Sequence, residues 1–257
     1  MREELENQTG GVDRRRFLRA GAGTIATAAG LGAGQQAAAE PPASPLQPVT
    51  LPMRALGKTG VAVTMLSLGT WMSPGGGRLL RSAWARGARY FDTAKSYGSE
   101  PMIAQWLEAM PGARKELFLV TKDQPDTPGE LFWQLDERLE ALQTDYVDLI
   151  FYHAMGDRNF DLELQWLRSK EMRQAADAIR SSGKAKFVGF STHHPARHLL
   201  LQAAAKSGFV DAIMLQNNPW MAQDGDMNRA LDACYKRGIG LISMKQVAGN
   251  MNLDELA

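Results

Sequence analysis

The amino-acid sequence predicts an α/β fold in which a parallel sheet closes into a (β/α) barrel. From residue 53 onward, short β-branched or aliphatic runs alternate with amphipathic stretches, and most starts recur about every 24–40 residues, the length of a βα unit. The nearly continuous apolar run at 147–152 indicates strands covered on both faces, as in parallel sheets. A doubly wound open sheet also fits these observations. However, no G-x-G-x-x-G follows any run, and the missing dinucleotide fingerprint favours the barrel.

The individual elements are assigned in chain order from these two periodicities. Amphipathic stretches predict helices, for example at 78–87, 129–144, 170–184 and 228–238. Several of them end on glycine shortly before the next strand, as at Gly183 and Gly238, which is a helix stop signal. Strands are predicted at seven runs: 63–68, 88–91, 117–121, 147–152, 187–190, 212–215 and 239–244.

Composition argues against several classes of function. The 29 basic and 28 acidic residues nearly cancel, and a net charge of +1 provides no electrostatic footprint for nucleic acid or an anionic membrane. The single cysteine, Cys234, excludes an intramolecular disulfide framework and a four-cysteine site for zinc or an iron–sulfur cluster. Because Cys234 lies in an amphipathic helical stretch, we expect it to be a packed core thiol.

The first 39 residues have the order of a secretory signal. The basic run RRRFLR (14–19) is followed by a Gly/Ala-rich, weakly apolar stretch and by three alanines at 37–39. An arginine pair followed by any residue and Phe-Leu resembles the twin-arginine export signal. The stretch is too short and too glycine-rich for a stable membrane anchor. We therefore expect a signal at 1–39, a flexible linker at 40–52, and an exported, periplasmic or otherwise extracytoplasmic barrel at 53–257.

Chemically useful side chains gather where the predicted strands end. In a barrel, residues at the C-terminal ends of the strands face the active site. The second run is followed by Asp92 and, slightly later, Tyr97; the third leads into Lys122 and the fourth into His153. Each residue alone has an ordinary structural explanation, such as a salt bridge. Together, three successive strand ends deliver all four to one rim, which predicts an active site there.

These four residue types suit the reduction of a carbonyl group. Hydride addition to a carbonyl carbon leaves an alkoxide that needs a proton, and Tyr97 could donate it. An ordinary tyrosine, with a pKa of about 10, is a weak acid near neutrality. A neighbouring cationic Lys122 stabilises the tyrosinate, and Asp92 keeps that lysine charged and oriented. His153 can hydrogen-bond the substrate carbonyl oxygen.

Several segments resemble the aldo-keto reductase superfamily, over about residues 53–249. MRALGKTGVAVTMLSLGTW resembles the family's opening hairpin and first barrel strand, and ARYFDTAKSYGSE its second strand and following loop. LFLVTK, DYVDLIFYH, GKAKFVGFSTHHP and AIMLQNNPW resemble the third to sixth strands. The resemblance implies a TIM-type (β/α)8 barrel and an NADP-dependent oxidoreductase acting on an aldehyde, ketone or alcohol. Its catalytic tetrad would be Asp92, Tyr97, Lys122 and His153.

The resemblance also implies a site for NADP, with NAD as the alternative, bound in an extended pose without a Rossmann domain. Thr192 stands where the family commonly has asparagine. His193 and His194 follow it, but adjacent strand residues point to opposite faces, so no metal site is expected. The positions that match cofactor contacts are Thr70, Trp71, Ser191, Thr192, Gln216, Met244 and Lys245.

Only seven barrel strands are predicted, because the short segment QVAGNMNLDELA alone follows Lys245. In the family, an eighth strand and the helix after it supply the site for the adenosine 2′-phosphate. A seven-stranded barrel would leave its first and seventh strands with unpaired edges. We expect the sequence to be a fragment of a longer chain; the alternative is a naturally short, inactive relative.

Three functions remain compatible with these observations. The first is a carbonyl reductase or alcohol dehydrogenase, which the complete tetrad favours. The second is a barrel that binds nicotinamide without turnover, in a sensor or subunit role like that of channel-associated relatives. The third is a carbohydrate- or small-molecule-binding barrel without nicotinamide. Segment 156–169, predicted as the longest loop, carries no motif diagnostic of a substrate.

Overall fold

The computed structural model describes residues 50–73, 76–218 and 223–246. The predicted export signal, residues 40–49 of the predicted linker and the segment after residue 246 lie outside the described residues. Within the described ranges, no helix is long and apolar enough to cross a membrane.

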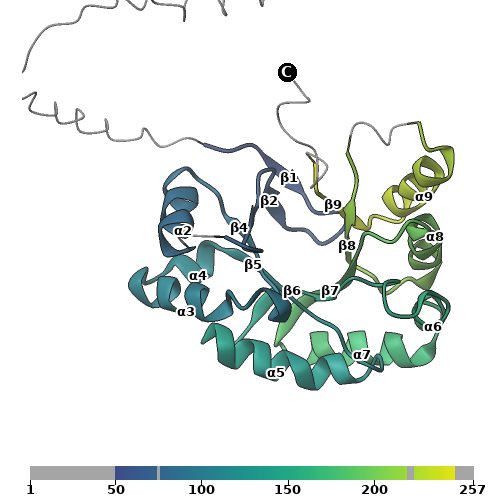
Figure 1. The fold of residues 1–257 in the computed structure, drawn as a ribbon, viewed down its shortest axis with the longest axis horizontal. Helices are drawn as coiled ribbons and strands as arrows, with labels where there is room; N and C mark the ends of the chain where they lie inside the picture. Colours follow the sequence, from purple (N-terminus) through teal and green to yellow (C-terminus); the bar gives the residue numbers. More distant parts are fainter. Residues whose placement is uncertain (1–49, 74–75, 219–222, 247–257) are drawn as a thin grey trace, which may run out of the picture. The chain divides into compact units, whose positions relative to one another are not determined.

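A parallel sheet of seven strands lies at the centre, and each strand pairs with the next one along the chain. Figure 1 shows the sheet curled, with the helices on its outside, which confirms the predicted α/β fold with seven barrel strands. The strands are β3 (Leu68–Gly69), β4 (Tyr90–Asp92), β5 (Phe118–Asp123), β6 (Val147–Tyr152), β7 (Ala185–Thr192), β8 (Ala212–Gln216) and β9 (Gly240–Met244).

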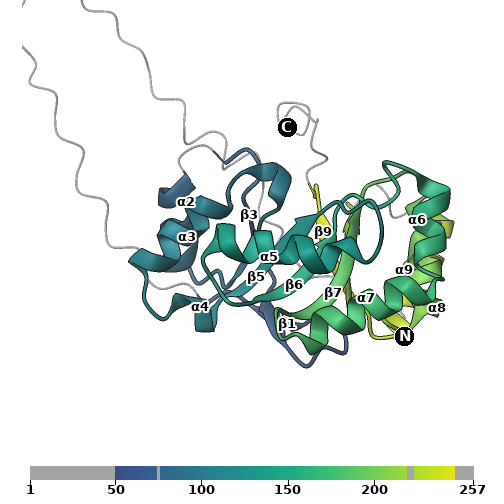
Figure 2. The same ribbon diagram turned by 90° about the horizontal axis from the view of Figure 1, so that it is seen from below.

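Helices connect successive strands and cover the outer face of the sheet. Polar side chains begin several of them: Ser169 caps α7 and Asp224 caps α9 by accepting a backbone N–H in the first turn. Figure 2 shows α5 and α7 crossing in front of the central strands. The helices are α2 (Gly76–Ala85), α3 (Glu100–Ala109), α4 (Ala113–Glu116), α5 (Glu130–Leu142), α6 (Phe160–Trp166), α7 (Lys170–Ser181), α8 (Arg197–Ser207) and α9 (Gly225–Lys236), with a short 3₁₀ turn, η1 (Lys95–Tyr97).

The structure corrects two assignments made from the sequence. The run at 63–68 is not one strand. Its start belongs to β2 (Ala62–Thr64), which pairs antiparallel with β1 (Met53–Ala55). The chain then turns before β3, and in this turn the Thr64 hydroxyl donates to the Leu66 carbonyl at 3.0 Å. Segment 156–169 is not only a loop. It contains α6, which begins because the Asn159 side chain accepts the Leu162 N–H at 3.2 Å.

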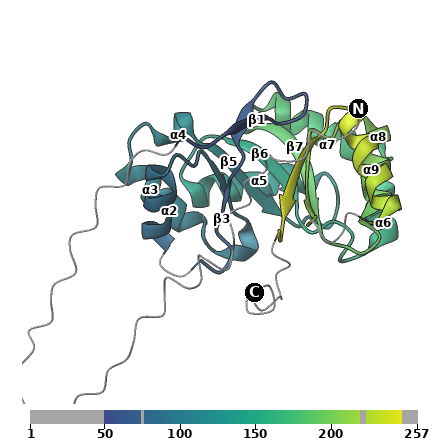
Figure 3. The ribbon, with the colours of Figure 1, turned by 90° about the horizontal axis from the view of Figure 1, so that it is seen from above.

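The β1–β2 hairpin packs against the beginning of β9. The Lys58 N–H donates to the Gly238 carbonyl at 2.7 Å. Gly57 has a φ of +54°, and a Cβ there would lie 2.2 Å from the Gly238 carbonyl oxygen, so only glycine fits this close approach. Figure 3 shows the hairpin at one end of the sheet. The hairpin thus lies at the end where the strands begin, and leaves the opposite end for strand-end side chains.

Two apolar clusters hold the sheet, one on each face. The outer cluster lies between the strands and the helices and includes the buried Cys234, as expected, whose thiol donates to the Leu201 carbonyl at 3.3 Å. This burial on both faces is what a curled parallel sheet requires. The inner cluster fills the concave side with the buried residues Leu56, Val63, Tyr90, Phe118, Val120, Leu149, Phe151, Ala212, Met214 and Ile242.

Candidate active site

Successive strand ends carry the four predicted catalytic residues to one rim. Asp92 is the last residue of β4, and Tyr97 closes the η1 turn that follows it. Lys122 lies on β5, in register with Phe151 of β6, and His153 is the first residue after β6. Because parallel strands run in the same direction, these positions all lie at the C-terminal end of the sheet.

The Lys122 ammonium lies at the centre of this group. Its Nζ donates to the Asp92 carboxylate at 2.7 Å and to the Thr93 carbonyl at 2.9 Å, and it lies 3.4 Å from the Tyr97 hydroxyl. The Tyr97 and His153 rings meet edge to face, with centroids 5.6 Å apart. The structure therefore brings all four predicted residues together.

Burial shifts the pKa of both the acid and the histidine. Burial raises the pKa of Asp92, and the Lys122 ammonium, 2.7 Å from its carboxylate, opposes that shift. Burial lowers the pKa of His153 to about 4, with smaller contributions from Lys122 and His193. The Ser96 hydroxyl lies 3.5 Å from the His153 Nδ1. His153 is therefore a neutral ring near pH 7, able to donate one hydrogen bond.

We expect the His153 ring to show no protonation between about pH 5 and 8. Its pKa falls from 6.5 to about 4 on folding, so the unfolded chain binds the proton first as the pH decreases. This residue therefore lowers the free energy of unfolding progressively as the pH falls from about 6.5 to about 4. Histidine-ring NMR during a pH titration, assigned with His153→Gln, measures the midpoint; a value near 6.5 would contradict the neutral ring.

Thr70 belongs to a buried chain of hydroxyl groups beside this cluster. The Ser99 hydroxyl lies 2.7 Å from the Thr70 hydroxyl and 2.7 Å from the Thr93 hydroxyl. The Thr70 hydroxyl also donates a hydrogen bond to the Asp92 carbonyl at 3.0 Å. These contacts join the ends of β3 and β4 to the start of α3. The next predicted contact residue, Trp71, has 63% of its surface exposed.

Ser191 and Thr192 both contact the loop after β6, in different ways. The Ser191 hydroxyl accepts the Ala154 N–H at 3.0 Å, which leaves its proton for a second partner. The buried Thr192 hydroxyl donates to the Met155 carbonyl at 2.7 Å and accepts the His194 N–H at 3.3 Å. The Ser191 hydroxyl proton therefore remains available to a second partner, whereas the Thr192 hydroxyl both donates to and accepts from the backbone.

The ends of β8 and β9 place three more predicted residues together. Gln216 and Met244 are register partners, and Lys245 follows with a φ of +56°. The exposed Lys245 lies close enough to His193 to lower the pKa of that ring, although burial is the larger cause. The His193 Nδ1 lies 3.3 Å from the Asp157 carboxylate, which opposes this lowering.

The donor and acceptor set at these strand ends fits a nicotinamide carboxamide. Such a group needs one acceptor for its N–H₂ and one donor for its C=O. Ser191 has a hydroxyl proton to donate, and the buried Asn218 Oδ1, two residues beyond β8, has no hydrogen-bond partner among the described residues. Sequence reasoning named Ser191 and missed Asn218, although its position in QNN after a predicted strand was a signal.

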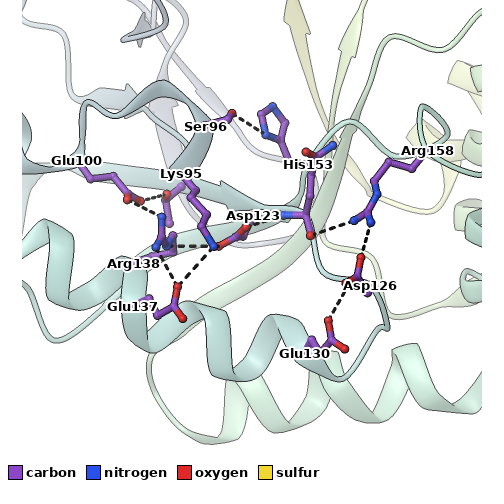
Figure 4. A network of polar contacts seen from close by, with 12 residues as sticks. Lys95, Ser96, Glu100, Asp123, Asp126, Glu130, Glu137, Arg138, His153 and Arg158 are labelled. Atoms are coloured by element: carbon purple, nitrogen blue, oxygen red, sulfur yellow. Dashed lines mark hydrogen bonds and ion pairs between the residues drawn. The ribbon is translucent and has the colours of Figure 1, made fainter.

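A buried ionic cluster next to the four residues was also missed (Figure 4). Arg138 Nη1 lies 3.0 Å from Glu100, and Arg138 Nε lies 3.4 Å from Asp123, whose carboxylate lies 3.6 Å from the Lys95 ammonium. Burial is the main cause that raises the pKa of Glu100. The sequence did indicate a buried charge here, because Arg138 lies on the apolar stripe of α5 that contains Leu131, Leu135 and Leu142.

The curled parallel sheet and this strand-end cluster define a class of protein, a (β/α)-barrel protein with a buried lysine between a carboxylate and a tyrosine. The sequence model of the aldo/keto reductase family matches residues 66–254. The chain therefore belongs to the aldo/keto reductase family, as its motifs indicate.

The chain is 28% identical over 223 residues to L-glyceraldehyde 3-phosphate reductase of Escherichia coli K12, covering 76% of this chain and 61% of that protein. It is 27% identical over 216 residues to L-galactose dehydrogenase of Arabidopsis thaliana, covering 76% and 65%. A thermostable aldo-keto reductase solved with the inhibitor epalrestat is similar at a TM-score of 0.60 and 27% identity, covering 75% and 72%. The chain thus spans less than two thirds of the length of the two curated relatives.

Proposed function

We propose that the protein is an oxidoreductase that transfers hydride between NADP(H) and an aldehyde, ketone or alcohol. The observation that carries this proposal is the position of the Lys122 ammonium, bonded to Asp92 and 3.4 Å from the Tyr97 hydroxyl, beside a neutral His153. Family membership supports the same reaction class and the use of a nicotinamide cofactor.

In the proposed mechanism, Tyr97 is the proton donor. A bound nicotinamide cofactor would supply the hydride. Tyr97 donates its hydroxyl proton to the carbonyl oxygen as that oxygen gains negative charge. Lys122 stabilises the tyrosinate that remains, and the buried Asp92 keeps the lysine charged and aimed. The neutral His153 donates a hydrogen bond to the carbonyl oxygen and orients it.

Strand-end residues on the other side of the rim would hold the nicotinamide. Ser191, Asn218 and Gln216 would supply hydroxyl and amide groups for the carboxamide, and the exposed Trp71 would supply an apolar contact for the cofactor. The charged, exposed Lys245 would meet the pyrophosphate together with the backbone at Met244, since lysine ammonium groups bind phosphate well.

The proposal is tested with the full-length protein by two measurements. Fluorescence titration with NADPH and NADH should show binding, with NADPH preferred, and the loss of NADPH absorbance should depend on added carbonyl compound. Aldoses and sugar-derived aldehydes are the first substrates to try, because the two curated relatives are named for glyceraldehyde 3-phosphate and galactose. Binding without oxidation would favour a sensor or subunit, and no binding would reject a nicotinamide role.

We also propose that the protein is exported by the twin-arginine machinery. The basic run at 14–19 and the following apolar and alanine segments support this. The route carries folded proteins, which suits a protein whose cofactor is acquired in the cytoplasm.

Replacing both Arg14 and Arg15 with lysine should keep the precursor inside the cell, because the machinery reads the arginine pair rather than the positive charge. Cell fractionation with an antibody against the protein measures this. Replacing Arg19 with lysine serves as the control and should leave export intact. Normal export of the double variant would reject this route.

A further inference from the structure

A buried carboxylate on the outer side of β5 links the elements that carry the candidate catalytic residues. Alternation along the strand points Lys122 into the rim and its neighbours Thr121 and Asp123 to the opposite face, toward the helices. Only 4% of Asp123 is exposed, and its side chain contacts Arg138 of α5 rather than the rim. Asp123 cannot touch a substrate, so any influence on the reaction must act through other residues.

Asp123 is the last residue of β5 and contacts two other parts of the rim, η1 and the loop after β6. It follows Lys122 directly in β5, and its backbone carbonyl accepts the His153 N–H at 2.8 Å. One carboxylate oxygen accepts the Gln124 N–H at 2.8 Å, and the other lies 3.6 Å from the Lys95 ammonium. Figure 4 shows Lys95 reaching from η1 to Asp123, with His153 on the other side of Asp123.

Lys95 connects this carboxylate to the turn that holds Tyr97. It is the first residue of η1, and its carbonyl accepts the Gly98 N–H at 3.2 Å, which closes the turn around Tyr97. The Lys95 ammonium, 3.6 Å from the Asp123 carboxylate, therefore links η1 to β5 by an ion pair. This matters because the Lys122 to Tyr97 hydroxyl distance is 3.4 Å, near the long limit of a hydrogen bond, so a small displacement of η1 would break it.

The surrounding charges make a buried Asp123 tolerable. Arg138 lies between Asp123 and Glu100, and Glu100 also accepts the Thr121 hydroxyl at 2.6 Å. Two carboxylates and two cations thus balance within the cluster. The exposed Glu137 contacts both cations, Lys95 at 3.5 Å and Arg138 at 3.3 Å, but among the described residues it makes no hydrogen bond or ion pair with β5 or with the loop after β6.

We propose that Asp123 and Lys95 are positioning residues that hold the Tyr97 turn at the distance from Lys122 needed for proton transfer. The inference rests on the proposed reductase function. Neither residue touches the reacting atoms: the Asp123 carboxylate acts through Lys95, and this ion pair sets the position of Tyr97 relative to the Lys122 ammonium. Outer contacts of this kind typically contribute about 10–100-fold, since misplacement by about 1 Å can cost 10²-fold.

The test uses the full-length protein and the variants Lys95→Met, Asp123→Asn and their combination. We expect each single variant to lower kcat by about 10–100-fold while KM and the NADPH affinity stay within about twofold. The double variant should be no slower than the slower single, because both changes break one link. Lys95→Arg should restore most of the activity by keeping the charge. Glu137→Gln is the matched control and should keep wild-type kcat.

A second measurement does not depend on activity. Tyrosine-ring NMR, with the Tyr97 signal assigned through Tyr97→Phe, should show that signal displaced in Lys95→Met and Asp123→Asn and unchanged in Glu137→Gln. Thermal melting verifies that the variants fold. In Asp123→Asn, Arg138 still has Glu100 as an ionic partner. If Asp123→Asn unfolds, Lys95→Met tests the same ion pair with less disturbance, because Lys95 is half-exposed. A wild-type kcat, additive losses or an undisplaced Tyr97 signal would overturn the positioning role. If the wild-type protein reduces no carbonyl compound but the Tyr97 signal is displaced in the two variants, the reductase function is rejected and the positioning role stands.

Discussion

Tyr97→Phe should lower kcat by about 10²–10⁴-fold, the usual contribution of a general acid. The substitution keeps the ring and its edge-to-face contact with His153, and it removes the only hydroxyl within reach of the Lys122 ammonium in the described structure. Because the hydroxyl acts in the transition state and not in cofactor binding, the NADPH dissociation constant should remain nearly unchanged. Steady-state kinetics and fluorescence titration of the full-length protein measure the two quantities.

A control variant separates loss of the proton from general disturbance of the rim. Tyr146→Phe removes a tyrosine hydroxyl just before β6, outside the cluster, and should leave kcat unchanged. If Tyr97→Phe reduces a carbonyl substrate as fast as the wild-type protein, Tyr97 is not the proton donor and the proposed mechanism fails.

Lys122→Met should abolish most of the activity and also destabilise the fold. The activity falls because the tyrosinate loses the cation that stabilises it. The stability falls because Asp92 is left buried without its partner, and breaking a buried ion pair on one side typically costs about 3–5 kcal/mol. Denaturant unfolding measures the second effect.

The double variant Lys122→Met with Asp92→Asn distinguishes the two roles of the lysine. With the carboxylate neutralised, the free energy of unfolding should recover in part, because no unpaired charge remains buried. Activity should stay low, because the cation beside Tyr97 is still absent. A double variant that regains both stability and activity would show that Lys122 only balances Asp92.

The positions of the four rim residues follow from the sequence, for a general physical reason. Parallel strands joined by helices all end at the same edge, so Asp92, Lys122 and His153 had to meet once the strands were recognised. The strand count was likewise readable, because the run at 147–152 and its neighbours are apolar on both faces. The burial of a strand can therefore be predicted from the order of apolar and polar residues within that strand.

The short elements needed the structure. β2 and β3 are only three and two residues long, and their separation depends on the turn at Thr64. α6 forms because Asn159 caps it and Trp166 packs into the core, and a seven-residue helix has too few residues for a clear periodic pattern. Whether such short helices and strands form depends more on capping and packing contacts than on the helix or strand propensity of their residues.

Side-chain pairing over long sequence distances was decided only by the tertiary structure. Arg138 pairs with Glu100, 38 residues earlier, and the hydroxyl of Thr192 turns to Met155 and not toward the rim. Any arginine on α5 could have met several carboxylates, and the sequence carries no measure of which one lies closest. Local periodicity therefore places the backbone and its strand ends, whereas the partner of each charged or hydroxyl side chain depends on how helices and strands pack, since hydrogen bonds and ion pairs act over only a few ångströms.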